Sequence, residues 1–98
     1  METHLIIPVN KFGEILISRP AGREHALIMR SSFRPATKEE PVELDFAGVR
    51  VVAPSWLDEV LTLLREEYGE RVRCMPSTNA SLVQSLKTLE ALPDEPEA

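Results

Sequence analysis

VELDFAGVRVVAPSWLDEVLTLL, residues 42–64, carries the strongest structural pattern in this chain. Its first five side chains alternate between apolar and acidic, which predicts a strand. An Ala-Gly pair then predicts a turn, and extended chain follows up to Pro54, because the residue before a proline avoids the helical region. From Ser55 onward, apolar side chains recur at helical spacing until Gly69, a typical stop residue. The segment therefore predicts a strand, a turn, an extended stretch and an amphipathic helix.

The segments on either side of residues 42–64 predict further strands and helices. Upstream, two apolar runs around a turn predict a β-hairpin, and Ser18 before Arg19-Pro20 predicts a capped helix start. Gly22 weakens that helix but suits close packing. Downstream, a short apolar strand is followed by Asn79, a natural helix cap. The expected elements are strands at 4–9, 13–17, 42–46 (continuing extended through 49–53) and 71–75, and helices at 18–31, 55–68 and 79–89.

The element order ββαβαβα defines the predicted fold class. Alternation of strands and helices after the hairpin predicts an α/β domain: a mixed β-sheet with helices packed on it. Ninety-eight residues, of which 43% are hydrophobic and 28% charged, fit one globular domain. We assign residues 1–92 to this domain and expect the acidic stretch 93–98 to be a disordered tail.

Composition argues against several classes of function. The single cysteine, Cys74, allows neither an intramolecular disulfide nor a cysteine-based zinc site, and no metal or cofactor is expected. The first residues lack the pattern of a signal peptide, and no apolar run is long enough to span a bilayer, so we expect a cytoplasmic protein. A net charge of −5 argues against general affinity for nucleic acid or anionic membranes. The glycines are isolated and no nucleophile–base pair stands out, so we expect no catalytic residues and no enzyme.

The same central segment carries a family resemblance. A strand reading Leu-Asp-apolar-x-Gly-Val, an extended stretch, a serine-bearing turn and an amphipathic helix resemble the signature region of STAS domains. These are the anti-sigma-factor antagonists and the cytoplasmic domains of sulfate transporters. The wording Pro-Ser-Trp-Leu-Asp-Glu-Val at 54–60 is similar to a bacterial STAS-like family of unknown function, whose members often read Pro-Ser-Phe-x-Asp-Glu. Most of residues 12–89 fit that layout, with 42–60 the specific part.

The resemblance implies a STAS-like fold (anti-sigma-factor antagonist-like) and a partner. In the antagonists, a serine at this helix start is phosphorylated by a partner kinase, within the pattern Asp-Ser-Ser-Gly. Those four positions are Ala53, Pro54, Ser55 and Trp56 here. The usual acceptor position is therefore Pro54, and only the second serine is present, as Ser55. A histidine-kinase-like ATPase or an anti-sigma-type protein is the partner that the resemblance suggests.

We accordingly expect a non-enzymatic, regulatory protein-interaction module. Its predicted partner-binding surface comprises the helix start and a neighbouring loop: Pro54, Ser55, Trp56, Asp58, Glu59, Thr78, Asn79 and Ser81. Most of these residues also have simpler roles. Ser55 is a natural helix cap with Asp58 at the capping-box position, Asp58 and Glu59 suit the positive end of the helix dipole, and Trp56 is either an exposed anchor or a lid on the core.

Two alternative functions and some local roles remain open at this stage. The domain could instead sense a small ligand or nucleotide near the same turn. The minor alternative is nucleic-acid binding through the first helix, where Arg23, Arg30 and Arg34 form a modest basic patch. On the same helix, His25 lies on the apolar face and suits a structural role better than a metal site. A homodimer is not decided by the sequence.

Overall fold

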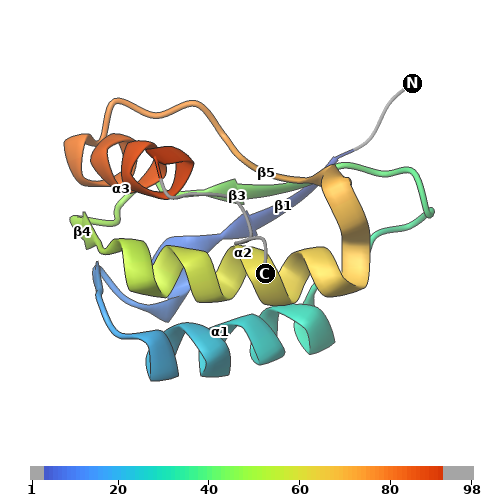
Figure 1. Cartoon of the computed structure of the whole chain (residues 1–98). Coiled ribbons are helices and arrows are strands. Elements are labelled where there is room, and N and C mark those ends of the chain that lie inside the picture. Colours follow the sequence, from blue (N-terminus) through green and yellow to red (C-terminus); the bar gives the residue numbers. More distant parts are fainter. Residues whose placement is uncertain (1–3, 92–98) are drawn as a thin grey trace, which may run out of the picture.

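The central strands bury every second side chain. In the computed structural model, which describes residues 4–91, Val42 and Leu44 are fully buried while Glu43 between them faces outward. The strands are β1 (Leu5–Pro8), β2 (Ile15–Leu16), β3 (Val42–Asp45), β4 (Val51–Val52) and β5 (Val72–Cys74). The helices are α1 (Arg19–Ser32), α2 (Pro54–Tyr68) and α3 (Ala80–Ala91), with the 3-10 turns η1 (Val9–Phe12) and η2 (Gly69–Arg71) (Figure 1). The predicted α/β class is confirmed, and the element order is roughly as predicted, except that the extended stretch 49–53 contains a separate strand, β4.

All strand pairings among residues 4–91 are parallel. β3 lies between β1 and β5, and β2 pairs with β4 in a second, two-stranded sheet. The predicted hairpin between residues 4–9 and 13–17 is therefore wrong, and the sheet is parallel rather than mixed. The reason lies in η1, because this single turn of 3-10 helix shifts the chain without reversing it.

Two neighbouring paths of the chain, β1 to β2 and β3 to β4, are each interrupted, and the interruptions lie next to each other at Asn10 and Gly48. Just after β3, the Asp45 carboxylate accepts a hydrogen bond from the Ala47 backbone N–H at 3.0 Å, and Gly48 takes a φ of +87°. A Cβ atom at Gly48 would lie 2.9 Å from the side-chain nitrogen of Asn10, in the break between β1 and β2. Because the two breaks touch, the chain resumes pairing in parallel as β2 and β4.

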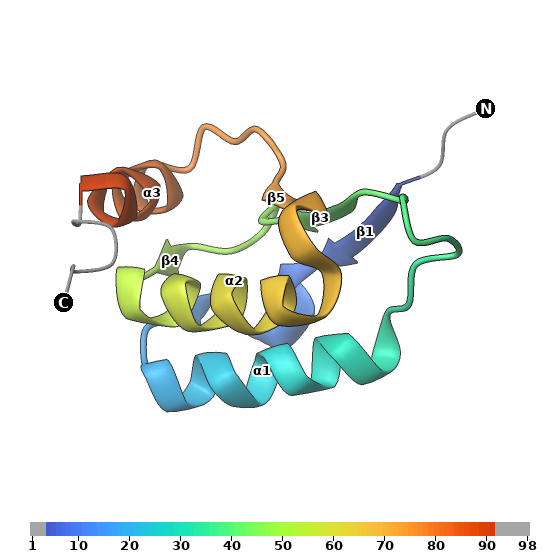
Figure 2. The same ribbon diagram turned by 45° about the vertical axis from the view of Figure 1, so that its right-hand side comes forward.

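Two helices cover one face of the sheet and the third lies apart. α1 and α2 run side by side beneath the strands, whereas α3 lies beside β4 and the flank of α2 (Figures 1 and 2). The predicted caps at Ser18 and Asn79 are confirmed: Ser18 accepts from the Ala21 N–H at 3.2 Å, and Asn79 accepts from Ser81 and Leu82. The stretch 93–98, predicted as a disordered tail, lies outside the described residues.

The contact between α1 and α2 is closest at Gly22. A Cβ atom there would lie 2.8 Å from the Trp56 carbonyl oxygen and 3.3 Å from the Glu59 Cβ, so only glycine allows this approach. The close packing predicted for Gly22 is confirmed. The buried face of α1 is made by Gly22, Ala26 and Met29. Ile28, one position before Met29, lies off this face and is 43% exposed.

We predict that Gly22→Ala lowers the free energy of unfolding by about 1–3 kcal/mol, the usual cost of overpacking. Alanine has the better helix propensity, by up to ~1 kcal/mol, so any net loss comes from the collision with the Trp56 backbone. Urea denaturation measures the difference. Glu24→Ala, an exposed change on the same helix, should stay within about 0.5 kcal/mol of the wild type. A Gly22→Ala protein as stable as the wild type would contradict the close contact.

Candidate functional site

Trp56 lies in the core beneath the start of α2. Its side chain is 0% exposed, and the Phe46 ring meets it edge-on with centroids 6.3 Å apart. The indole Nε1 donates a hydrogen bond to His25 Nδ1 at 3.1 Å, which satisfies its only polar group. The prediction that Trp56 contacts a partner is therefore wrong in this structure. It closes the core between α1 and α2, the lid role that the sequence also allowed.

His25 is a structural histidine, as expected. Its ring packs against Phe12 at a centroid distance of 5.3 Å and accepts the Trp56 hydrogen bond through Nδ1. That bond assigns the proton of the neutral ring to Nε2, since Nδ1 must offer a lone pair. Burial lowers the pKa of His25 below its ordinary value, and the nearby Glu24 carboxylate opposes this only in part.

Ser55 does not cap α2. The helix begins at Pro54, and its N-cap is Ala53, which offers no side-chain hydrogen bond. The prediction of a Ser55 cap, with Asp58 completing a capping box, is wrong because the proline takes the first helical position and carries Ser55 into the first turn. There the Ser55 hydroxyl donates to the Ile17 carbonyl oxygen at 3.0 Å. The side chain thus connects the start of α2 to the end of β2.

Asp58 and Glu59 face α1 rather than the end of their own helix. The Arg19 Nη1 donates to the Asp58 and Glu59 carboxylates, each at 3.0 Å, and Arg23 lies 3.7 Å from Glu59. Neither acid lies in the first turn of α2, so the predicted dipole role is not supported. Their main contacts hold the two helices together. The Glu59 side chain is only 18% exposed, which leaves it little surface for a partner.

The basic patch predicted on α1 is largely neutralised. Arg23 pairs with Glu59, and the Arg30 Nη2 lies 2.9 Å from the Glu67 carboxylate. Arg34, the third residue of the predicted patch, lies after the end of α1 and forms no ion pair within the described residues. A helix face whose two remaining patch arginines already pair with acids offers little to a phosphate backbone. The nucleic-acid alternative therefore loses the observation that motivated it.

Asn79, just before α3, and Ser81, in its first turn, form hydrogen bonds with the backbone of β4 and the segment before it. The Ser81 hydroxyl accepts from the Val52 N–H at 2.9 Å and donates to the Val52 carbonyl at 3.0 Å. Ser85 donates to the same carbonyl at 2.7 Å, and the Asn79 side-chain amide donates to the Val49 carbonyl at 2.7 Å. Side chains of α3 thus take the place of a further strand beside β4. Of the predicted loop residues, Thr78 is exposed.

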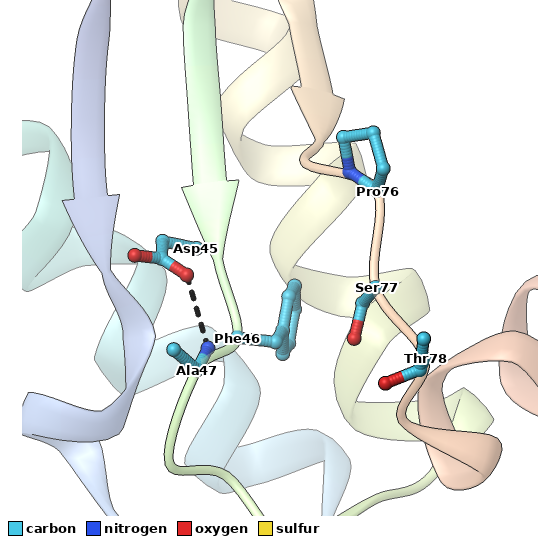
Figure 3. Close-up of a pocket in the computed structure, with 6 residues that line it drawn as sticks. All are labelled: Asp45, Phe46, Ala47, Pro76, Ser77 and Thr78. Atoms are coloured by element: carbon cyan, nitrogen blue, oxygen red, sulfur yellow. Dashed lines mark hydrogen bonds between the residues drawn. The ribbon is translucent and has the colours of Figure 1, made fainter.

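A shallow groove lies between the ends of β3 and β5. Asp45, Phe46 and Ala47 line one side, and Pro76, Ser77 and Thr78 line the other (Figure 3). The cavity measures about 540 Å³, and the buried Phe46 ring lies between its two walls. The groove is at the carboxyl ends of parallel strands, the usual place for ligands in open α/β sheets.

An exposed apolar patch beside the start of α2 was not predicted. Ile15, Ile17 and Val51 are 58%, 54% and 41% exposed, while their neighbours Leu16 and Val52 are buried. Ile15 pairs directly with Val51 between β2 and β4, so the side chains lie on one outward face. We call these three residues the β2–β4 patch. The alternation of Ile15, Leu16 and Ile17 was the available signal, but a run of three apolar residues does not show which face is covered.

The structure thus brings together only part of the predicted surface. Ser55, which follows Pro54 at the start of α2, adjoins the β2–β4 patch through its hydrogen bond to Ile17, and Thr78 lines the groove. Trp56 is buried, Glu59 is mostly covered by α1, and Asn79 and Ser81 are engaged by the β4 edge. Among the described residues, no group of three or more metal-ligating side chains occurs, and no helix is long and apolar enough to cross a membrane.

Comparison with known proteins supports the STAS-like fold. The model of a family described as a STAS-like domain of unknown function matches residues 30–74, a little under half of the chain. This range runs from the end of α1 through α2 to β5 and contains the segment that carried the resemblance. The STAS-like resemblance is therefore confirmed. Comparisons with curated proteins and with solved structures found no match.

The Trp56–His25 hydrogen bond predicts a loss of stability in acid. The folded pKa of His25 lies below the ordinary 6.5, so the stability tied to the neutral ring is fully present above pH 6.5 and is lost as the pH falls through the folded pKa. Protonation would also place a hydrogen on His25 Nδ1, so that it faces the Trp56 N–H as a second donor and the hydrogen bond between them is lost. Urea unfolding at pH 7.5 and pH 5.5 should show a loss of order 1 kcal/mol.

His25→Gln provides the control, because its side-chain oxygen can accept from Trp56 without titrating. Its stability should change less between the two pH values than that of the wild type. His4 is common to both proteins and cancels in the comparison. Equal losses in the two proteins would contradict the role given to His25.

Proposed function

We propose that this chain is a non-enzymatic, regulatory protein-interaction module of the cytoplasm that docks a protein partner through the β2–β4 patch together with Pro54 and Ser55. The observation that carries this proposal is the continuity of three exposed aliphatic side chains with the start of α2. A histidine-kinase-like ATPase or an anti-sigma-type protein is the partner that the STAS-like resemblance favours.

The patch has the character of an interface core. Apolar side chains at the centre of a contact supply most of its favourable free energy, and a polar rim surrounds them. Completing the burial of each patch residue is worth of order 1 kcal/mol. The patch lies on short strands whose backbone is already fixed by pairing, so docking would cost little ordering entropy.

Modification of Ser55 would act directly on this surface. A phosphate would replace the hydroxyl that donates to the Ile17 carbonyl, and would place about −1.5 to −2 charges beside that oxygen. Asp58, one turn along α2, adds like charge. A partner that covers the apolar patch would have to desolvate this added charge, which is unfavourable. Phosphorylation of Ser55 is thus suited to release a partner that covers the patch.

A pull-down from lysate of the native cell, with captured proteins identified by mass spectrometry, tests the docking surface. Ile15→Ser with Val51→Thr should reduce capture of a specific partner at least tenfold, because two central apolar contacts are lost. Leu27→Ser is the matched control, since Leu27 is 46% exposed on α1, away from the patch, and should leave capture unchanged. Equal capture by both variants would contradict the proposed surface.

The same assay separates a charge switch from a structural effect. Ser55→Asp should abolish capture, whereas Ser55→Ala, which removes the hydrogen bond without adding charge, should retain most of it. If Ser55→Asp captures the same partner as strongly as the wild type, Ser55 is no switch. Circular dichroism confirms that each variant is folded.

A second candidate function is sensing of a small ligand in the groove between β3 and β5. It is supported by the position of the groove at the carboxyl ends of the strands, and by the polar groups of Ser77 and Thr78 along one wall (Figure 3). Ligand screening by thermal shift tests it, because a ligand that binds only the folded protein raises the melting temperature. Thr78→Ala should reduce that shift. A shift unaffected by this change would place the ligand elsewhere.

A further inference from the structure

A second groove lies at the other end of α2. It is formed by the segment after α1 and by the last turn of α2 with η2, and measures about 570 Å³. In both views this segment extends beyond the C-terminal ends of α1 and α2, at the end of the molecule opposite to β4 (Figures 1 and 2). Its charged lining residues are Arg34, Lys38, Arg71 and Glu67. We call it the Arg71 groove.

The Arg71 side chain is held in place by hydrogen bonds to backbone carbonyl groups rather than by an ion pair with a carboxylate. Its Nε donates to the Tyr68 carbonyl at 2.9 Å, and its Nη1 donates to the Thr37 carbonyl at 3.0 Å. The guanidinium carbon lies 5.7 Å from the centroid of the Tyr68 ring. None of the described acids forms an ion pair with Arg71, so its charge is positioned by neutral groups and its Nη2 remains available for a ligand.

The segment around the groove is also fixed. The Glu40 carboxylate accepts a hydrogen bond from the Ala36 N–H, and the Tyr68 hydroxyl donates to the Phe33 carbonyl at 3.1 Å. Glu40 is only 8% exposed and is used by this turn. A loop held from both of its ends places its outward side chains in a defined arrangement. Arg34 and Lys38 extend from this loop as exposed residues.

The groove carries an excess of positive charge. Arg34 and Lys38 have no ion-pair partner within residues 4–91, and the one lining carboxylate, Glu67, is paired with Arg30 at 2.9 Å. Burial and the Glu67 charge raise the pKa of Tyr68, and the positive charges of Arg34, Arg30 and Arg71 oppose that rise only in part. The groove is thus lined by three cations, Arg34, Lys38 and Arg71, while the chain as a whole carries −5.

We propose that the Arg71 groove binds the phosphate group of a small molecule. Three cations against one already paired carboxylate match a dianion, and the Nη2 group of Arg71 together with the Arg34 guanidinium can donate to phosphate oxygens. The cations converge on one groove rather than forming a stripe, and the net charge of −5 repels an extended polyanion such as DNA. This site does not depend on the docking surface, which lies at the opposite end of α2.

Nuclear magnetic resonance titration of the full chain tests this inference. The probes are inorganic phosphate and glycerol 3-phosphate, each added at constant ionic strength against chloride. Saturable shifts of the backbone amides of residues 34, 36–38 and 71 are expected with at least one probe. A stronger response to glycerol 3-phosphate would identify a phosphate ester, and a stronger response to phosphate the free ion; either supports the site.

Charge variants complete the test. Arg34→Gln and Lys38→Gln, both at exposed positions, should each weaken binding by about five- to tenfold, as expected for loss of a charge-assisted hydrogen bond. Arg50→Gln removes an exposed positive charge outside the groove and should change the affinity less than twofold. The inference is overturned by absence of saturable shifts, by shifts centred on other residues, by equal weakening in Arg50→Gln, or by tighter binding of a DNA duplex than of either probe.

Discussion

The close contact between α1 and α2 at Gly22 sets the position of Trp56 and of the start of α2. Because Gly22 has no side chain, the Trp56 backbone can approach α1, and the indole ring then lies fully buried between the helices. His25 completes the contact by accepting the indole hydrogen bond. Nearer the surface, the Arg19 guanidinium donates hydrogen bonds to the Asp58 and Glu59 carboxylates. The first turn of α2 is thereby fixed, and with it the position of Ser55.

The matching breaks in the two neighbouring strands explain why an apolar patch is exposed. Touching kinks at Asn10 and Gly48 displace β2 and β4 from the main sheet into a small sheet of their own. One edge of that sheet is closed by Ser81 and Ser85 of α3. Its inner face supplies Leu16 and Val52 to the core, and the three aliphatic side chains of its outer face remain exposed. The proposed docking surface therefore results from the separation of β2 and β4 from the three-stranded sheet.

Local patterns predicted the elements better than their connections. Ser18, Asn79 and Gly69 each mark a helix end through groups within a few residues, and each was predicted correctly from the sequence. The turn at residues 10–13 was misread as a reversal, because the same residue types suit a hairpin and a 3-10 kink. Ser55 was misassigned as a cap, since Pro54 is equally compatible with preceding a helix and with beginning one.

The candidate site could not be predicted in full, because it is determined by contacts between residues that are far apart in the sequence. Whether Trp56 faces a partner or the core is decided by Gly22 and His25, more than thirty positions away in the sequence. The exposure of Ile15 and Val51 depends on the pairing of β2 with β4, whereas β2 was predicted to pair with residues 4–9 in a hairpin. The fold class, by contrast, followed from the order of elements and from the segment that resembles STAS domains. Residues 30–74 match that family, which agrees with the prediction.

Site-specific photocrosslinking in the native cell tests the docking surface most directly. A photoreactive phenylalanine analogue replaces Val51 at the centre of the patch or, in the control protein, Leu27 on α1. The account predicts one discrete adduct from position 51, reduced when Ser55→Asp is added, and no corresponding adduct from position 27. No adduct at position 51, or the same adduct from both positions, would contradict the claim that this surface docks a partner.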